Sequence, residues 1–148
     1  MSYLGLSEME DVEVASRLLE KEKLNLVIVK EGQVLYSSNE KGLRPFFEAI
    51  LGIEDALHNA AVADRILGLA VAMLCLHARI ASVYAGIVST GALAMLKGQG
   101  VTITSKNVVP HIFNYEGTDL CPFEKLAQKC GQPSELLSAL QSLFVEGQ

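Results

Sequence analysis

The spacing of apolar and polar positions predicts a chain that begins with a helix and a β-hairpin. Apolar residues at helical spacing predict a first helix, which begins near Ser7 with Glu10 completing a capping box and runs to about residue 23. Residues 24–30 and 33–38 are predicted to form two strands joined by a tight turn at Glu31 and Gly32. Because residues 26–29 are apolar on both faces, we expect the first strand to be covered on both sides.

Helices and strands alternate in the rest of the chain. We expect helices over residues 46–51, 60–77, 90–97, about 122–131 and 134–145, and an irregular connector over residues 53–59. Thr118 or Asp119 would cap the fourth of these helices, and Ser134 would cap the last. Strands are expected over residues 82–88, 101–104 and, as a short one, 112–115. A hairpin followed by such crossovers predicts an α/β fold, a three-layer α/β/α sandwich around a mixed sheet of four to five strands.

Length and charge narrow the class of protein. The chain has 148 residues, of which 17 are acidic and 12 basic, so the net charge is −5. We therefore expect a single domain, with a core over about residues 8–131 and the last helix beyond it, and no binding of nucleic acid. The three cysteines fit neither a disulfide framework nor a zinc knuckle, which predicts free thiols in the cytoplasm. The longest uncharged run, residues 66–78, would rise about 20 Å as a helix, too little to cross a membrane.

Two sequence segments carry a resemblance to a known family. They read LVIVKEG at residues 26–32 and GTDLCPFE at residues 117–124, the second containing the pattern Thr-Asp-x-Cys-Pro-x-Glu. With the order of elements, they resemble an uncharacterised bacterial and archaeal family that is placed in the cytidine-deaminase-like superfamily. The resemblance covers roughly residues 10–130. It implies a deaminase-like fold without assigning a reaction.

The zinc chemistry of deaminases can be tested against the residues. Those enzymes need His or Cys with a nearby Glu at one helix start and Pro-Cys-x-x-Cys at the next. The expected helix starts, residues 62–65 and 89–92, contain neither His nor Cys, and the chain has no Cys-x-x-Cys. His77 is followed two residues later by Arg79 at a helix end, where no zinc site would form. We therefore expect no metal, no cofactor and no zinc-dependent deamination.

Three candidate ligand-binding residues follow from the expected carboxyl edge of the sheet. Asp64 would lie in the first turn of the helix over residues 60–77, as an acid/base group or simply as a partner of the helix dipole. Ser89 and Thr90 join a strand end to a helix start, a place that suits a phosphate or carboxylate, although Ser89 could be an ordinary cap.

The segment containing the shared pattern supplies the candidate catalytic residues. Cys121 would lie at a helix start, where the positive end of the dipole favours a thiolate. Glu124 could face it one turn later, and Asp119 could cap the helix. A well-formed helix start with a small buried cysteine explains the same residues. A basic partner for the thiol would have to be His111.

Arg44 and Lys41, after the hairpin, could hold an anion or could be solvated charges. The leading hypothesis is a metal-free domain that binds a small anionic or nucleotide-type ligand at the carboxyl edge. The alternatives are a cysteine-dependent enzyme with Cys121 as nucleophile and a non-catalytic interaction module. The apolar stripe of the last helix could also support a homodimer. It consists of Leu136, Leu137, Leu140, Leu143 and Phe144.

Overall fold

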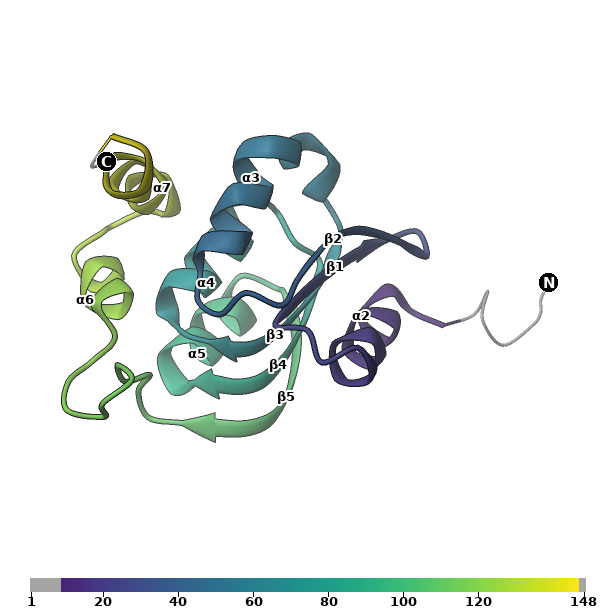
Figure 1. Ribbon diagram of the computed structural model, residues 1–148, viewed down its shortest axis with the longest axis horizontal. Helices are drawn as coiled ribbons and strands as arrows, with labels where there is room; N and C mark the ends of the chain where they lie inside the picture. The colour runs from purple at the N-terminus through teal and green to yellow at the C-terminus, as the bar shows by residue number, and fades with distance from the viewer. Residues whose placement is uncertain (1–8, 147–148) are drawn as a thin grey trace.

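The centre of the molecule is a mixed sheet of five strands (Figure 1). The computed structural model describes residues 9–146. Its strands are β1 (Leu26–Lys30), β2 (Gln33–Ser38), β3 (Ala61–Leu67), β4 (Ser82–Ser89) and β5 (Thr102–Val109), in the spatial order β2-β1-β3-β4-β5. β1 is antiparallel to β2 and β3, whereas β3, β4 and β5 are parallel. The carboxyl ends of these three parallel strands therefore lie on one side, called the carboxyl edge below.

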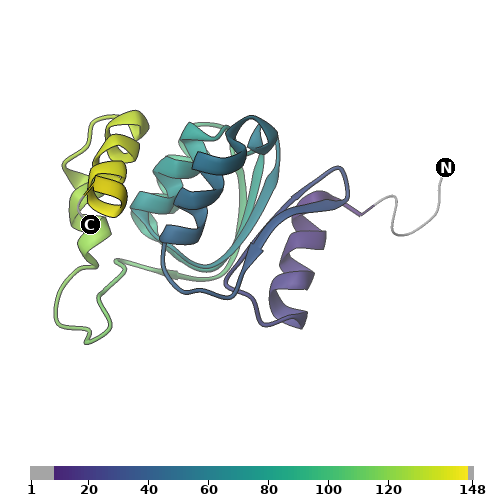
Figure 2. The ribbon, with the colours of Figure 1, turned by 45° about the horizontal axis from the view of Figure 1, so that its top comes forward.

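Helices cover both faces of this sheet (Figure 2). α2 (Asp11–Lys21) lies on one face, and α3 (Arg44–Leu57), α4 (Leu69–His77) and α5 (Thr90–Gly98) lie on the other. α6 (Pro122–Gln128), α7 (Pro133–Gln141) and the π-helical turn η1 (Ser142–Glu146) follow, and both α6 and α7 contact α4. The predicted three-layer sandwich with a mixed sheet is confirmed.

The two-sided cover expected for β1 is also confirmed. Leu26 and Ile28 belong to the main core under α3 and α4, whereas Val27 and Val29 belong to a smaller core under α2. All four are at most 3% exposed. Since alternate strand residues point to opposite faces, an apolar run of this kind is stable only between two helical layers. Within residues 9–146, no helix has the length and apolar content needed to cross a membrane.

The most important correction concerns residues 60–77. They form not one long helix but β3 followed by α4, with Gly68 between them. β3 lies in the middle of the sheet, so it is apolar on both faces and resembles a buried helix in its pattern. Asp64 is therefore a strand residue and not part of a helix start.

Several other boundaries also differ from the prediction. α3 runs from residue 44 to 57 and includes the expected connector, with a kink at Ile53. β5 extends to Val109, and the expected strand over residues 112–115 is only an isolated bridge between Phe113 and Leu120. α6 begins after Cys121, which takes the N-cap position expected for Thr118 or Asp119, and ends at Gln128. α7 is capped by Gln132, with Glu135 completing a capping box, and not by Ser134. The expected cap Ser7 lies outside the described residues.

Candidate functional site

The start of α4 at the carboxyl edge is closed by a carboxylate from a distant part of the chain. Glu124, on α6, accepts hydrogen bonds from the backbone N–H groups of Leu69 (2.9 Å) and Ala70 (3.1 Å). Its side chain is buried, with 7% of the residue exposed. The first N–H groups of a helix have no partner within the helix and attract negative charge. Glu124 thus ties the C-terminal part of the chain to the end of β3.

Gly68 makes this contact possible. A Cβ atom at this position would overlap the Glu124 carboxyl group. The backbone of Gly68 is extended, with φ −102°, so the glycine is required for space and not for its conformational freedom.

The start of α5 lies at the end of β4. Ser89 is buried and its Oγ accepts a hydrogen bond from the N–H of Ala92 (3.2 Å), so it caps the helix as expected. Thr90 is exposed, and its hydroxyl donates to the carbonyl of Pro110 over 3.4 Å. This bond connects the start of α5 with the chain leaving β5.

The chain from β5 to α6, residues 110–121, is called the edge segment here. It folds back on itself, because Cys121 donates its N–H to the carbonyl of Ile112 (3.0 Å) and Asn114 to that of Asp119 (2.9 Å). Asp119 accepts from the N–H of Leu120 and pairs with Lys125. This hydrogen bond from Lys125, aided by the Leu120 N–H, lowers the pKa of Asp119.

The three predicted catalytic residues are neighbours, but their side chains serve different contacts. Cys121 is half-buried at the N-cap of α6. The Glu124 carboxylate is directed at α4, and the Asp119 carboxylate at Lys125. The ring of His111 contacts that of Phe113, with the ring centroids 6.3 Å apart. Activation of the Cys121 thiol therefore stays a prediction.

Two cationic side chains lie near the edge segment or the C-terminal turn. The Nζ of Lys41 lies 5.9 Å from the ring centroid of Tyr115. Arg44 lies in the first turn of α3, where it pairs with Glu48 (3.2 Å) and stacks on Phe144 at 5.1 Å. Arg44 is therefore engaged within the protein, whereas Lys41 reaches the edge segment.

Asp64 lies below this edge instead of on its rim. It pairs with Leu26 on one side and Ala85 on the other, three residues before the end of β3, and is 9% exposed. Burial raises the pKa of Asp64 to about 7, although the N–H groups of Ile66 and Arg65 oppose the rise. Burial also raises the pKa of the Cys75 thiol, and the nearby Asp64 charge adds to this effect.

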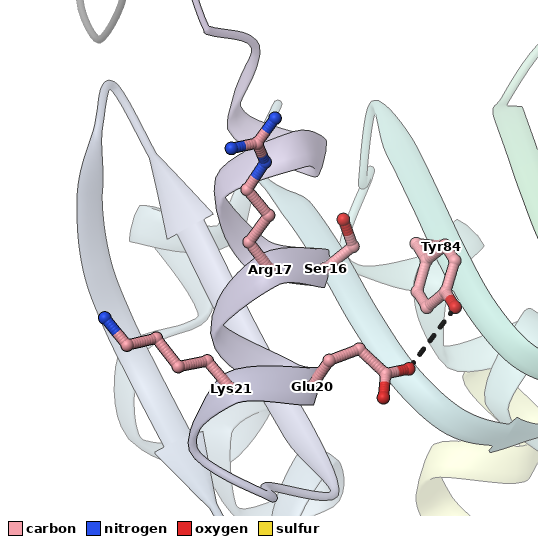
Figure 3. Close-up of a pocket in the computed structure, with 5 residues that line it drawn as sticks. All are labelled: Ser16, Arg17, Glu20, Lys21 and Tyr84. Carbon is pink, nitrogen blue, oxygen red and sulfur yellow. Dashed lines mark hydrogen bonds between the residues drawn. The ribbon is translucent and has the colours of Figure 1, made fainter.

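A shallow depression of about 530 Å³ lies elsewhere, between α2 and β4 (Figure 3). Ser16, Glu20 and Tyr84 face one another there, while Arg17 and Lys21 point away from Tyr84. The Glu20 carboxylate is engaged by the Tyr84 hydroxyl (3.5 Å) and by ion pairs. None of the predicted site residues lines this depression. In the described part of the chain, no three His, Cys, Asp or Glu side chains are grouped so that they could hold a metal ion.

A protein-family model described as TM1506, domain of unknown function (DUF1893), matches residues 14–144. The chain belongs to this family. The structure is similar to that of the DUF1893 family protein TM1506 from Thermotoga maritima, with a TM-score of 0.83 and 25% identity over 97% of each chain. The expectation of an uncharacterised family is thereby confirmed.

The relation of this DUF1893 domain to deaminases is much weaker. A diaminohydroxyphosphoribosylaminopyrimidine deaminase/5-amino-6-(5-phosphoribosylamino)uracil reductase from Thermotoga maritima matches with a TM-score of 0.46 and 14% identity. The match covers 78% of this chain and 39% of that one. Similarity at this level supports no inference about activity, so membership of the cytidine-deaminase-like superfamily stays a prediction. Among curated proteins, none matches this chain.

Two features of the DUF1893 domain were not predicted from the sequence. One is the pairing of Glu124 with the start of α4 across more than fifty residues, for which no local signal exists. The other is the exposure of Phe113 and Tyr115 on the edge segment. The alternation of His111, Phe113 and Tyr115 is visible in the sequence and could have indicated it.

Proposed function

We propose that this domain binds a small anionic ligand at the carboxyl edge of its sheet. The observation that carries the proposal is the convergence of distant segments there: the edge segment is bonded to the start of α5 through Thr90, and α6 to the start of α4 through Glu124. Ligands of open α/β sheets bind beyond the carboxyl ends of the strands, where loops from different strands meet.

Chemical features of this edge favour a small anion over a large partner. The start of α4 already holds one carboxylate, that of Glu124, so the available surface lies at Thr90 and Gly91, which are exposed, and at Lys41. Asp64 is too deeply buried to line this surface, and Arg44 is engaged by Glu48 and Phe144. Ser89 holds the α5 start in place through its cap.

A thermal-shift screen tests the proposal with inorganic phosphate, sugar phosphates and nucleoside monophosphates as probes. A ligand present at a hundred times its Kd stabilises the native state by about 2.7 kcal/mol, which raises Tm by about 5–10 °C in a chain of this size. We expect such a rise for at least one phosphate-bearing probe and a smaller rise in Lys41→Gln. If no probe changes Tm at millimolar concentration, the proposal is wrong.

A further inference from the structure

Three aromatic residues alternate along the outer part of the edge segment. They are His111, Phe113 and Tyr115, called the aromatic strip below. His111 is exposed, Phe113 is 53% exposed, and Tyr115 is 89% exposed. Exposed aromatic rings on one short segment offer apolar faces on which a ligand ring can stack.

Although the aromatic strip is exposed, backbone hydrogen bonds hold the segment that carries it. On one side of Phe113, Ile112 accepts a hydrogen bond from the N–H of Cys121, and on the other, Asn114 donates to Asp119. A further turn is closed by the N–H of Gly117 and the carbonyl of Asn114 (3.0 Å). These backbone bonds hold the strip in place before any ligand arrives, which lowers the entropy cost of binding.

The charges near the strip restrict what can bind there. The ammonium group of Lys41 lies over Tyr115, and among the ion pairs of residues 9–146 none involves Lys41. Glu40 and Glu116, the chain neighbours of Lys41 and Tyr115, are acidic. Lys41 is a single positive group, which can pair with one phosphate, whereas the acidic neighbours and the net charge of −5 oppose a polyanion such as nucleic acid.

We infer that the aromatic strip and Lys41 bind a flat heteroaromatic ring that carries one phosphate group. The ring stacks on Tyr115, and the phosphate pairs with Lys41, whose ammonium group lies next to that aromatic ring. Stacking on aromatic side chains accepts many ring systems, so a nucleoside monophosphate and a flavin mononucleotide share the required chemistry. The inference rests on the proposed function and assigns its ligand class.

The test uses the full-length protein and isothermal titration calorimetry with matched probes. Adenosine 5′-monophosphate has ring and phosphate, adenosine only the ring, and ribose 5-phosphate only the phosphate; flavin mononucleotide is the second source of the ring. We expect both mononucleotides to bind at least about tenfold more tightly than ribose 5-phosphate. Tyr115→Ala should weaken the binding of both mononucleotides about 5- to 150-fold and leave the affinity for ribose 5-phosphate unchanged. Tyr115→Phe should bind the mononucleotides as tightly as the parent does. Lys41→Gln should weaken the phosphate-bearing probes and spare adenosine.

Control variants separate stacking from general damage. Tyr115 is 89% exposed, so its truncation should not unfold the protein, and Leu51→Ala is the control that removes a half-exposed apolar side chain of α3, away from the strip. Equal affinity for ribose 5-phosphate and the mononucleotides, unchanged in Tyr115→Ala, would overturn the inference while the proposed function stands. Absence of binding by every probe would overturn both. Tighter binding of a single-stranded oligonucleotide than of the mononucleotides would also contradict the inference.

Discussion

The Asp64 carboxyl lies inside a central strand, and its burial couples the stability of the protein to pH. Its pKa is raised to about 7, whereas the unfolded chain has a value of about 3.9. Between these two values the native state binds more protons than the unfolded state. The free energy of unfolding therefore falls as the pH rises from about 4 to above 7, by about 4 kcal/mol from this group.

Asp64→Asn tests this coupling, because the amide has the same shape and does not ionise. We expect the variant and the parent to be similarly stable near pH 4.5 and the variant to be the more stable at pH 8. Urea unfolding across this pH range measures the difference. Asp55→Asn, which alters an exposed carboxyl of α3, is the control, and its free energy of unfolding should change with pH as that of the parent does. If the free energy of unfolding of Asp64→Asn has the same pH dependence as that of the parent, Asp64 does not couple stability to pH.

Arg65, on β3, connects α2 to the sheet through two hydrogen bonds of its planar guanidinium group. Its Nε donates to the carbonyl of Leu24 (2.7 Å) and its Nη2 to that of Leu19 (2.9 Å). Lysine keeps the charge but cannot donate in this fork, so Arg65→Lys should lower the free energy of unfolding by about 1–3 kcal/mol. Glu20→Gln removes the exposed carboxylate that pairs with Arg65 and Lys106 and should cost less than about 1 kcal/mol. Equal losses in the two variants, measured by urea unfolding, would contradict the role assigned to the two guanidinium hydrogen bonds.

The contact between α4 and α6 can be measured as a coupling between Gly68 and Glu124. Glu124→Ala leaves the buried N–H of Ala70 and the part-buried N–H of Leu69 without a partner and should cost about 1–3 kcal/mol. Gly68→Ala introduces a Cβ that overlaps the carboxyl group. The loss in the free energy of unfolding should be smaller in the double variant than the sum of the losses in the two single variants, because removal of the carboxylate makes room for the methyl group.

Gly98→Ala is the matched control for this cycle. Its Cβ would meet nothing within 4 Å, and alanine favours the helix, so the substitution should be neutral or stabilising. Additive losses for Gly68→Ala and Glu124→Ala in urea unfolding would mean that the two positions do not interact.

At the scale of elements, the sequence predicted what depends on local signals. The hairpin follows from a turn at Glu31 and Gly32, both with positive φ, and α5 from its cap Ser89. β3 was assigned to a helix because apolar residues on both faces give no periodicity, and only Gly68 marks the division. β5 was cut short because residues 105–107 of this edge strand are polar and interrupt its apolar pattern.

The candidate site was predictable only in part, for a related reason. Ser89 and Cys121 precede helix starts, as expected, since caps and first-turn prolines are local features. Glu124 was expected to face Cys121, but its partners lie at the start of α4, more than fifty residues earlier in the chain. A contact of this kind depends on how the elements pack and has no signature within either segment.

At the scale of the whole molecule, most of the C-terminal apolar stripe packs against the rest of the chain. Leu136 and Leu140 are fully buried in the main core, and Phe144 packs on Phe47 and Phe123 at 5.3 and 5.6 Å. Of the stripe, Leu143 is exposed to 54%. A stable interface buries about 800 Å² on each partner, far more than one leucine provides.

A homodimer through this stripe would therefore depend on Leu143. We expect Leu143→Asp to leave the sedimentation coefficient unchanged at every protein concentration, because the remaining stripe residues face the interior. Leu140→Asp should instead unfold the protein, since it buries a charge in the core. Conversion of a dimer to a monomer by Leu143→Asp would show that η1 is an interface, and that the stripe serves both the core of the chain and a second copy.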